Sequence, residues 1–437
     1  MKKNFILLAS VGMLLTACGT KPVENSQGNG NSSEAPAGAP VKDGTITLTK
    51  NHDGKEVSFL HERTQAYIDA MYEAAEAEDL DEEQMYRMRD NACGTVNPVD
   101  YQGPKGQNDQ DHFVPIKLEW NMDGYTGSYK VKYATDRMLT DAKELTVTTN
   151  SAELVNLFTD TEYFWQVETE DGSHDSAVGS FKTYGHYRMI ESGLAYNVRD
   201  FGGKMTKSGR RIKQGLIYRG GELTNVQYDT GIPQKHIVTL DANTKDIFLN
   251  TMNVRVDLDF RNAGSESNNI SDSPLNTADF GDDNDNIQVT FSRQSVSSLA
   301  NFWGNTAPAT LKNSFMAFSN AKEDAAVYCH CWGGADRTGT AFFILEGLLG
   351  VSYTECLIDY ELTSFDNIHT RRRDTRVTDE NGYNYNFPDL TNRIKQDNPD
   401  WATRDFSDIC AEWLENRVGF TKAEIETLKE NLLEPEE

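Results

Sequence analysis

Hydrophobic and polar residues alternate with period two through much of the first half of the chain. Ile116, Leu118 and Trp120 alternate with polar neighbours, and the same spacing recurs within 129–133 and 163–167. Clusters of Asn, Asp and Gly separate these runs. Several short strands separated by turns are typical of a small β-sandwich. We therefore predict such a domain over residues 96–184.

The second half alternates short apolar runs with segments of helical periodicity, which indicates an α/β fold over residues 185–437. Four runs predict buried strands: 215–218, 254–260, 287–291 and 325–329. Two segments predict helices, 340–350 and 421–433, and the second begins with a capping box between Thr421 and Glu424. Two long irregular stretches, 262–286 and 371–390, have the length of functional loops.

Three segments precede the predicted β-sandwich. Residues 61–95 are acidic with apolar residues at helical spacing, so we expect a short helical segment. Residues 19–60 begin with a stretch rich in Gly, Ser, Asn and Pro, which indicates a flexible linker. Within residues 1–18, two lysines precede a short apolar core, and two small residues precede Cys18. This order resembles the lipobox of bacterial lipoprotein signal peptides.

The lipobox resemblance implies that Cys18 is acylated and that the mature protein is a lipid-anchored, extracytoplasmic protein of the bacterial cell envelope. The apolar core is too short to span a bilayer. An ordinary cleaved signal peptide with an incidental cysteine is the alternative. Five cysteines remain besides Cys18, an odd number that is expected if one thiol must stay free to react.

The net charge of −26 limits the partners of this chain. A nucleic acid would require a basic face, so the acidic composition excludes that class of partner. The overall field would also repel an anionic substrate, so the attraction for such a substrate must come from a local basic pocket. At 437 residues, the chain is long enough for two folded units.

The segment with the clearest chemistry is residues 330–339, which follow a predicted strand and open a predicted helix. Backbone amides at a helix N-terminus bind a tetrahedral dianion, and Gly333 and Gly334 allow close approach to it. Arg337 can hold two phosphate oxygens. The same positive field is expected to lower the pKa of Cys331 and make it a nucleophilic thiolate.

The spacing Cys-x5-Arg-Thr in this segment resembles the phosphate-binding loop of the protein tyrosine phosphatase superfamily. Further motifs in the same order resemble the bacterial atypical tyrosine phosphatases: Asn197–Gly203, Gly215–Leu223, Asp259–Arg261 with Glu266, Asp359–Thr363 and Gly419–Leu433. The resemblance covers roughly residues 186–434. It implies a central parallel-rich sheet flanked by helices, and hydrolysis of phosphotyrosine, with phosphoserine, phosphothreonine and phosphoinositides as further substrates.

The resemblance also implies roles for single residues. Cys331 is the expected nucleophile, Arg337 the phosphate clamp and Asp336 the general acid, with Asp259 as the rival acid. The loop residues expected to bind phosphate are Trp332, Gly333, Gly334, Ala335, Thr338 and Gly339. Arg261 and His330 are additional candidates, and His330 is expected to orient the loop. No metal or other cofactor is expected, and the partner is a phosphorylated protein or a small phosphate ester.

One loop position departs from the family pattern. Ala335 stands where the family usually has Lys, which argues against phosphoinositide activity because a second positive charge is missing. An extracytoplasmic, phytase-like inositol phosphate phosphatase is an alternative, although such loops usually end in Gly-Arg-Thr. A non-catalytic phosphate-binding or adhesion lipoprotein is a second alternative, against which the intact Cys331, Asp336 and Arg337 argue.

Other features remain open or have simple explanations. Leu157, Thr161 and Tyr163 resemble the tyrosine corner of fibronectin type III domains, with Thr159 where Pro is usual. The predicted β-sandwich is therefore a spacer or a module that binds carbohydrate or protein. Residues 281–286 are an acidic run that fits a solvated insertion better than a calcium loop. Residues 371–373, three arginines, form either the basic rim of the pocket or a solvated helix end.

Overall fold

The computed structural model describes residues 45–50, 52–76, 113–223, 240–263, 270–276, 287–365 and 387–436. These residues belong to one structural unit, 44–437. Cys18, Glu266 and the runs 281–286 and 371–373 lie outside the described residues. In the described part of the chain, every helix is too short or too polar to cross a membrane.

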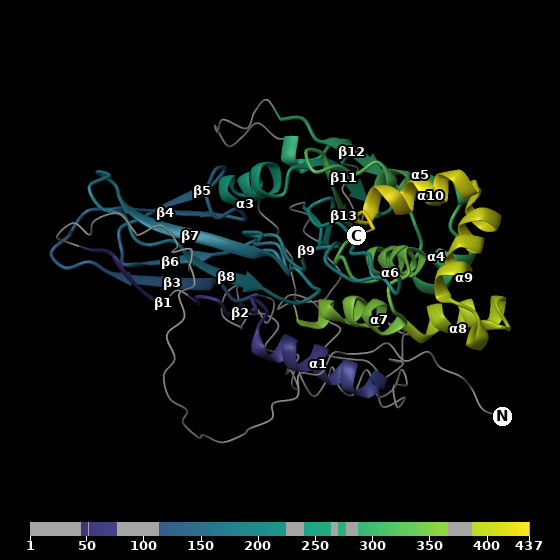
Figure 1. The fold of residues 1–437 in the computed structure, drawn as a ribbon. Helices are drawn as coiled ribbons and strands as arrows, with labels where there is room; N and C mark the ends of the chain where they lie inside the picture. The colour runs from purple at the N-terminus through teal and green to yellow at the C-terminus, as the bar shows by residue number, and fades with distance from the viewer. Residues whose placement is uncertain are drawn as a thin grey trace, which may run out of the picture. The chain divides into compact units, whose positions relative to one another are not determined.

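Two sheets occupy the N-terminal part and confirm the period-two pattern (Figure 1). One has the order β1-β3-β6 and the other β2-β8-β7-β4-β5. Their bounds are Thr47–Lys50 (β1), Glu56–Val57 (β2), Ile116–Asn121 (β3), Tyr129–Ala134 (β4), Lys143–Val147 (β5), Ser151–Leu154 (β6), Glu162–Thr169 (β7) and Gly179–Thr183 (β8). Leu118, Val131 and Trp165, from three different strands, are fully buried in one shared hydrophobic cluster. We call residues 45–60 and 113–184 the sheet pair.

The predicted linker was wrong at its C-terminal end. Strand β1 pairs antiparallel with β3, and β2 pairs parallel with β8. Ile46 and Phe59 are buried in the cluster of the sheet pair. The run 45–50 does alternate apolar and polar residues, but it is short and follows a segment rich in Gly, Ser, Asn and Pro, and β2 has only two residues; both strands are ordered by the edges that they pair with.

A second five-stranded sheet confirms the α/β prediction for the C-terminal half. Its order is β12-β11-β13-β10-β9. The bounds are Arg199–Asp200 (β9), Ile217–Gly220 (β10), Val254–Asp259 (β11), Thr290–Arg293 (β12) and Ala326–His330 (β13). Strands β10 to β13 are parallel to one another and β9 is an antiparallel edge. The carboxyl ends of β10, β11, β12 and β13 therefore meet at one edge of the sheet.

Strand β12 begins three residues later than the predicted run 287–291. The amide group of the Asn276 side chain exchanges two hydrogen bonds, both of 2.8 Å, with the backbone N–H and C=O of Val289. These bonds take the place of strand pairing just before Thr290, where β12 starts. A side chain distant in sequence thus decides the boundary.

Helices cover both faces of this sheet (Figure 1). Alternate residues of β13 belong to different clusters: Ala326 and Tyr328 pack with Phe248, whereas Val327 and Cys329 pack with the larger helical layer. The first face has α3 (Ala242–Asp246) and the π-helical turn η2 (Ile247–Thr251). The helices that contribute to the larger cluster are α4 (Leu299–Gly304), α5 (Pro308–Ser319), α6 (Arg337–Leu349), α7 (Tyr353–Glu361), α8 (Phe387–Asp397), α9 (Phe406–Trp413) and α10 (Lys422–Leu432).

Short helical turns complete the C-terminal half. They are η3 (Pro274–Asn276), η4 (Leu362–Phe365), η6 (Trp401–Thr403) and the π-helical η7 (Leu414–Val418). The predicted capping box is confirmed, since Thr421 and Glu424 exchange side-chain and backbone hydrogen bonds at the start of α10. The predicted helix 340–350 is also confirmed as α6, which begins earlier, at Arg337.

Helix α1 (Glu62–Glu76) packs against the C-terminal half, beside α7 (Figure 1). Tyr67, Ile68 and Met71 are buried in the same cluster as α6 and α7. The helical spacing of apolar residues predicted a helix here. It could not indicate which part of the protein the apolar side of the helix packs against. The predicted separate segment 61–95 is therefore, in its described part, an element of the C-terminal core.

Candidate active site

The loop from Cys331 to Asp336 connects the end of β13 to the start of α6. This strand, loop and helix order is the one predicted. Asp336 is the N-cap residue of α6, but its side chain makes no capping hydrogen bond. The loop therefore presents the N-terminus of a thirteen-residue, almost wholly buried helix, whose dipole favours an anion at this end.

Hydrogen bonds from the surrounding domain fix the orientation of the peptide groups in this loop. The carbonyls of Trp332, Gly333 and Gly334 all accept hydrogen bonds from the surrounding domain. The donors are the Tyr196 hydroxyl (2.7 Å) and Glu222 N–H (3.1 Å) to Trp332, Asn197 Nδ2 (2.8 Å) to Gly333, and Arg219 Nη2 (2.8 Å) to Gly334. In a planar trans peptide the N–H points opposite to the C=O, so the following amides face away from these donors. Such convergent amides form an anion-binding concavity.

Gly334 is required by the close approach of two backbone segments. Its φ is +67°, a left-handed conformation. A Cβ atom at this position would lie 2.2 Å from the carbonyl oxygen of Gly220, at the end of β10. Only glycine satisfies both conditions without moving the sheet edge.

Cys331 is buried, and its environment favours the thiolate. Burial by itself raises the pKa of the thiol, but the positive charge of Arg337 and hydrogen bonding from Thr338 outweigh it, so the pKa of Cys331 is lowered. The buried Thr338 hydroxyl makes no conventional hydrogen bond to other described residues, so the sulfur is its natural partner. Neighbouring Cys329 is a buried free thiol, and burial raises its pKa.

His330 lies behind the loop between a carboxylate and a carbonyl. Its Nε2 is 2.8 Å from Asp257 Oδ1, and its Nδ1 is 3.1 Å from the carbonyl oxygen of Cys331. Burial lowers the pKa of His330, but Asp257 and Asp259 outweigh it, so the pKa is raised. A doubly protonated imidazole donates to both oxygens. This geometry fits the expected orienting role and leaves His330 no free nitrogen to act as a base.

Asp259 is held as an anion at the end of β11. Its carboxylate accepts hydrogen bonds from the backbone N–H, Nε and Nη2 of Arg261 at 2.9, 2.9 and 3.0 Å. Burial raises the pKa of Asp259, but His330 and Arg261 outweigh that effect and lower it. Arg261 also donates to Glu222 Oε2 at 2.6 Å. A carboxyl group held this way is a poor proton donor at neutral pH.

Asp336 differs from Asp259 in place and exposure. It lies in the loop between β13 and α6 and is only half-buried. The Tyr360 hydroxyl of α7 donates to Asp336 Oδ1 over 3.5 Å. Asp336 and Arg337 are adjacent residues at the start of α6, and both are close enough to affect the pKa of Cys331, which Arg337 lowers and Asp336 raises.

Beneath the loop lies a cluster of buried charged side chains. Asp359 of α7 is 3.0 Å from Arg199 Nε and 2.5 Å from Arg219 Nη1. Lys204 lies 3.1 Å from Glu346 and 3.7 Å from Asp359. Burial raises the pKa of Asp359, but the surrounding cations outweigh it and hold that pKa far below its usual range. The cluster anchors the donors that support the loop.

Sequence reasoning identified several of these supporting residues only as parts of motifs. Asn197, Arg219 and Asp359 lie within the motifs that resemble the atypical tyrosine phosphatases, but the motifs assign them no role. Tyr196 and Asp257 lie outside those motifs. A signal did exist, because Arg219 and Asp257 are charged residues inside apolar strands. Buried charges need partners, so such positions indicate a polar network.

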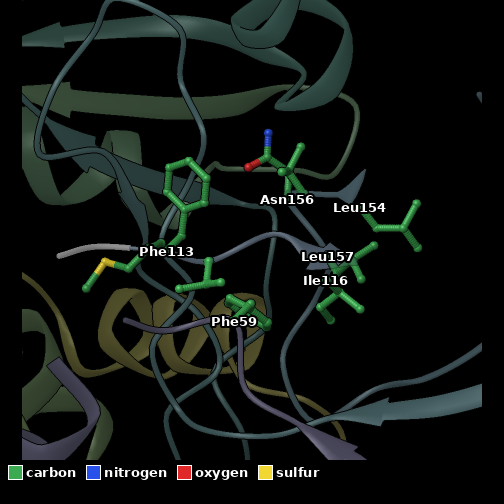
Figure 2. A pocket seen from close by; sticks show the side chains of 9 residues that line it. Phe59, Phe113, Ile116, Leu154, Asn156 and Leu157 are labelled. Carbon is green, nitrogen blue, oxygen red and sulfur yellow. The ribbon is translucent and has the colours of Figure 1, made fainter. Parts of the chain in front are cut away.

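The apolar pocket between the sheet pair and the C-terminal half is not a ligand site (Figure 2). Phe59, Phe113, Ile116 and Leu157 line it, with Met189 from the C-terminal half. Its volume of about 10 Å³ is at most enough for one water molecule.

Comparison with known proteins agrees with this site. A model of the tyrosine phosphatase family matches residues 191–434, more than half of the chain, and this range contains the loop from Cys331 to Asp336 and every donor named above that bonds to its carbonyls. No curated protein matches the chain. By this match the chain belongs to the tyrosine phosphatase family, whose members hydrolyse phosphoesters.

Proposed function

We propose that this protein hydrolyses phosphomonoesters through a phosphocysteine intermediate, with phosphotyrosine in proteins as its main substrate class. Phosphoserine, phosphothreonine and lipid phosphates are secondary candidates. The observation that carries the proposal is the buried Cys331, whose pKa is lowered. Cys331 directly follows β13 in a loop that leads into α6 and whose carbonyls are held by hydrogen bonds from the surrounding domain. A thiolate in an anion-binding loop is the arrangement needed to attack bound phosphate.

In the first step, the phosphate is held by loop amides and Arg337. The Cys331 thiolate attacks phosphorus, an S–P bond forms and the P–O bond to the alcohol or phenol breaks. Asp336 gives its proton to the leaving oxygen. The positive charge of Arg337 and the α6 dipole stabilise the negative charge on the transferring group.

In the second step, water attacks the phosphocysteine. Asp336, now ionised, accepts a proton from that water while the S–P bond breaks and inorganic phosphate is released. Cys331 leaves as a thiolate, which Arg337 and the Thr338 hydroxyl stabilise. Every proton transfer uses groups of this chain.

The nucleophile is tested by phosphate release from the full-length chain. Wild-type protein is assayed on phosphotyrosine peptides, phosphoserine peptides, phosphoinositides and inositol hexakisphosphate. Cys331→Ser should abolish turnover yet retain vanadate binding, because the hydroxyl is a poor nucleophile and the loop is intact. Comparable turnover by the mutant would exclude the cysteine mechanism. The substrate panel also separates a protein phosphatase from the phytase-like alternative.

Asp336 is proposed as the general acid because Asp259 is held ionised by Arg261. Asp336→Asn should slow alkyl and phenyl phosphates by about 10²- to 10⁴-fold. It should hardly affect esters of very acidic phenols, which need no proton. Equal losses on all leaving groups would show that Asp336 has a structural role only.

The location and the sheet pair carry separate proposals. We infer that Cys18 is acylated and that the protein is anchored at the outside of a bacterial membrane; Cys18→Ala should then prevent detergent partitioning. A free N-terminus elsewhere, found by mass spectrometry, would exclude the anchor.

The fibronectin type III resemblance of the sheet pair is supported by Phe158, whose N–H donates to the Tyr163 hydroxyl at 2.8 Å, as in a tyrosine corner.

A further inference from the structure

The sheet pair is fixed to the C-terminal half by the connection between β6 and β7, residues 156–160, here called the corner loop. The Asn156 side chain exchanges two hydrogen bonds, of 2.9 and 2.7 Å, with the backbone of Glu191. The Gln214 side chain exchanges two, of 2.8 and 3.0 Å, with the backbone of Thr159. The Thr159 hydroxyl donates to the Gly185 carbonyl at 2.6 Å. Such paired bonds fix both the distance and the orientation of the sheet pair relative to the C-terminal half. A flexible spacer would need neither.

Arg188 is the centre of this contact. Its Nε donates to the Leu157 carbonyl at 2.9 Å and its Nη2 to the Asn156 carbonyl at 2.6 Å. Its Nη1 donates to Asp200 Oδ2 at 2.7 Å, and its guanidinium lies 4.3 Å from the centre of the Phe158 ring. Arg188 is buried. One side chain therefore joins the corner loop to strand β9.

Strand β9 carries the next step toward the catalytic loop. Asp200 donates its backbone N–H to the Arg188 carbonyl at 2.9 Å, and the adjacent Arg199 donates to Asn197 Oδ1 at 2.6 Å. Asn197 in turn donates to the carbonyl of Gly333 at 2.8 Å. A series of hydrogen bonds, joined at one point by the peptide bond between Arg199 and Asp200, thus runs from the sheet pair to the loop from Cys331 to Asp336.

Helix α1 provides a second connection. The Tyr72 hydroxyl donates to Glu355 Oε1 at 3.2 Å, and the Tyr67 ring lies 5.2 Å from the ring of Phe365. Glu355 belongs to α7 and Phe365 to the turn that follows it. Helix α7 also carries Asp359, the ion-pair partner of Arg199. Both connections therefore meet at the Arg199–Asp359 pair beneath the loop.

We propose that the sheet pair and helix α1 position the loop from Cys331 to Asp336. Arg188 and Asp200, which join the sheet pair to this loop, are positioning residues for the phosphatase reaction. The proposal rests on the proposed function of the loop. Catalytic groups must be held to a fraction of an ångström, and a displacement of about 1 Å can cost about a hundredfold in rate. Arg188 touches no reacting atom, so it acts only through Asp200, Arg199 and Asn197.

The test compares Asn156→Ala, Arg188→Ala and Arg188→Lys in the full-length chain. Controls are Lys132→Ala, which removes a 2.6 Å ion pair with Glu168 inside the sheet pair, and Arg210→Ala, which removes a 2.7 Å pair with Glu430 in the C-terminal half. The readouts are kcat and KM on an aryl phosphate, Tm, and the pH dependence of iodoacetamide alkylation of Cys331 followed by mass spectrometry.

Arg188→Ala should lower kcat about tenfold and Asn156→Ala about threefold, with a raised apparent pKa of Cys331 in both. Arg188→Lys keeps the charge beside Asp200 but cannot bind both corner-loop carbonyls, so it should stay impaired. The controls should remain within about twofold of wild type, since surface pairs contribute little.

Two outcomes would overturn the inference. One is wild-type kcat and alkylation profile in folded Asn156→Ala and Arg188→Ala. The other is full rescue by Arg188→Lys, which would mean that only the charge beside Asp200 matters. If Arg188→Ala does not fold, Asn156→Ala decides, because it leaves every buried charge paired. Alkylation reports loop geometry without turnover, so failure of the proposed reaction and failure of this inference are distinguishable.

Discussion

The sheet pair and the C-terminal half both bury large hydrophobic clusters, but they differ in buried charge. The polar side chains buried in the described sheet pair are the uncharged Thr159, Thr169, Ser176 and Thr183. The C-terminal half buries many ionisable side chains: Arg188, Arg199, Asp200, Lys204, Arg219, Glu222, Lys245, Asp257, Asp259, Arg261, His330, Glu346, Glu355, Asp359 and Glu361. Burying an ion costs several kcal/mol even in a relaxed protein.

The comparison shows which region of this protein contains buried charged side chains, whose burial is energetically unfavourable. Several of these charged side chains bond to the loop from Cys331 to Asp336 or to groups that do: Arg219 donates to the Gly334 carbonyl, and Asp359 pairs with Arg219. Within the loop and at the start of α6, Cys331 is buried, whereas Asp336 and Arg337 are only half-buried. The buried ions therefore hold the loop in position, whereas the sheet pair needs only apolar packing to keep its shape.

The largest effect is expected from Asp359→Asn. The substitution keeps the shape of the side chain but leaves Arg199 and Arg219 without their shared anion. The free energy of unfolding should fall by about 3–5 kcal/mol, and kcat should fall with it because both arginines support the loop. Urea denaturation and steady-state kinetics measure the two effects. A loss below about 1 kcal/mol would show that these buried charges are not a stabilising network.

Leu118→Ala is the matched change in the sheet pair, where Leu118 is fully buried. Its cavity should cost about 2–5 kcal/mol. At temperatures where the protein stays folded, kcat should remain within about twofold, because Leu118 contributes apolar packing to the sheet pair and takes no part in the hydrogen bonds that join the corner loop to Glu191 and Arg188. Calorimetry and kinetics on the same samples test this. A large loss of kcat in folded protein would remove the contrast between the two regions.

A smaller, pH-dependent effect is expected at Glu346. Burial and the nearby Asp359 raise the pKa of Glu346 to about 8, although Lys204 and Arg219 oppose them. Between the unfolded value of 4.5 and about 8, the folded state holds a proton that the unfolded state has released. Stability from this group therefore falls as pH rises through that interval, by at most about 1.4 kcal/mol per pH unit.

Glu346→Gln removes this titration and keeps the shape of the side chain. The mutant should lose less stability than wild type between pH 5.5 and pH 9, and it should be the more stable of the two at pH 9 by about 1 kcal/mol or more. Urea denaturation at both pH values gives the comparison. Parallel pH profiles for the two proteins would mean that Glu346 is already ionised in the fold.

Much of the site could be predicted because its signals are local. The segment 330–339 contains the proposed nucleophile Cys331, the arginine and the glycines within ten residues, and the strand before it and helix after it have clear apolar patterns. The capping box of Thr421 and Glu424 is equally local. Elements whose order depends on distant partners were missed or misplaced, as β1, β2 and the start of β12 were.

The sequence by itself determined the α/β and β-strand regions and the strand, loop and helix order around residues 330–339, because periodicity and motif spacing act over a few neighbouring residues. Only the tertiary structure decided that α1 packs on α7, that Asp259 is tied to Arg261, and that Arg188 links the corner loop to β9. These contacts join residues far apart in the chain. Their formation depends on the geometry of the whole fold, since a buried charge or apolar stripe requires a partner without specifying which one.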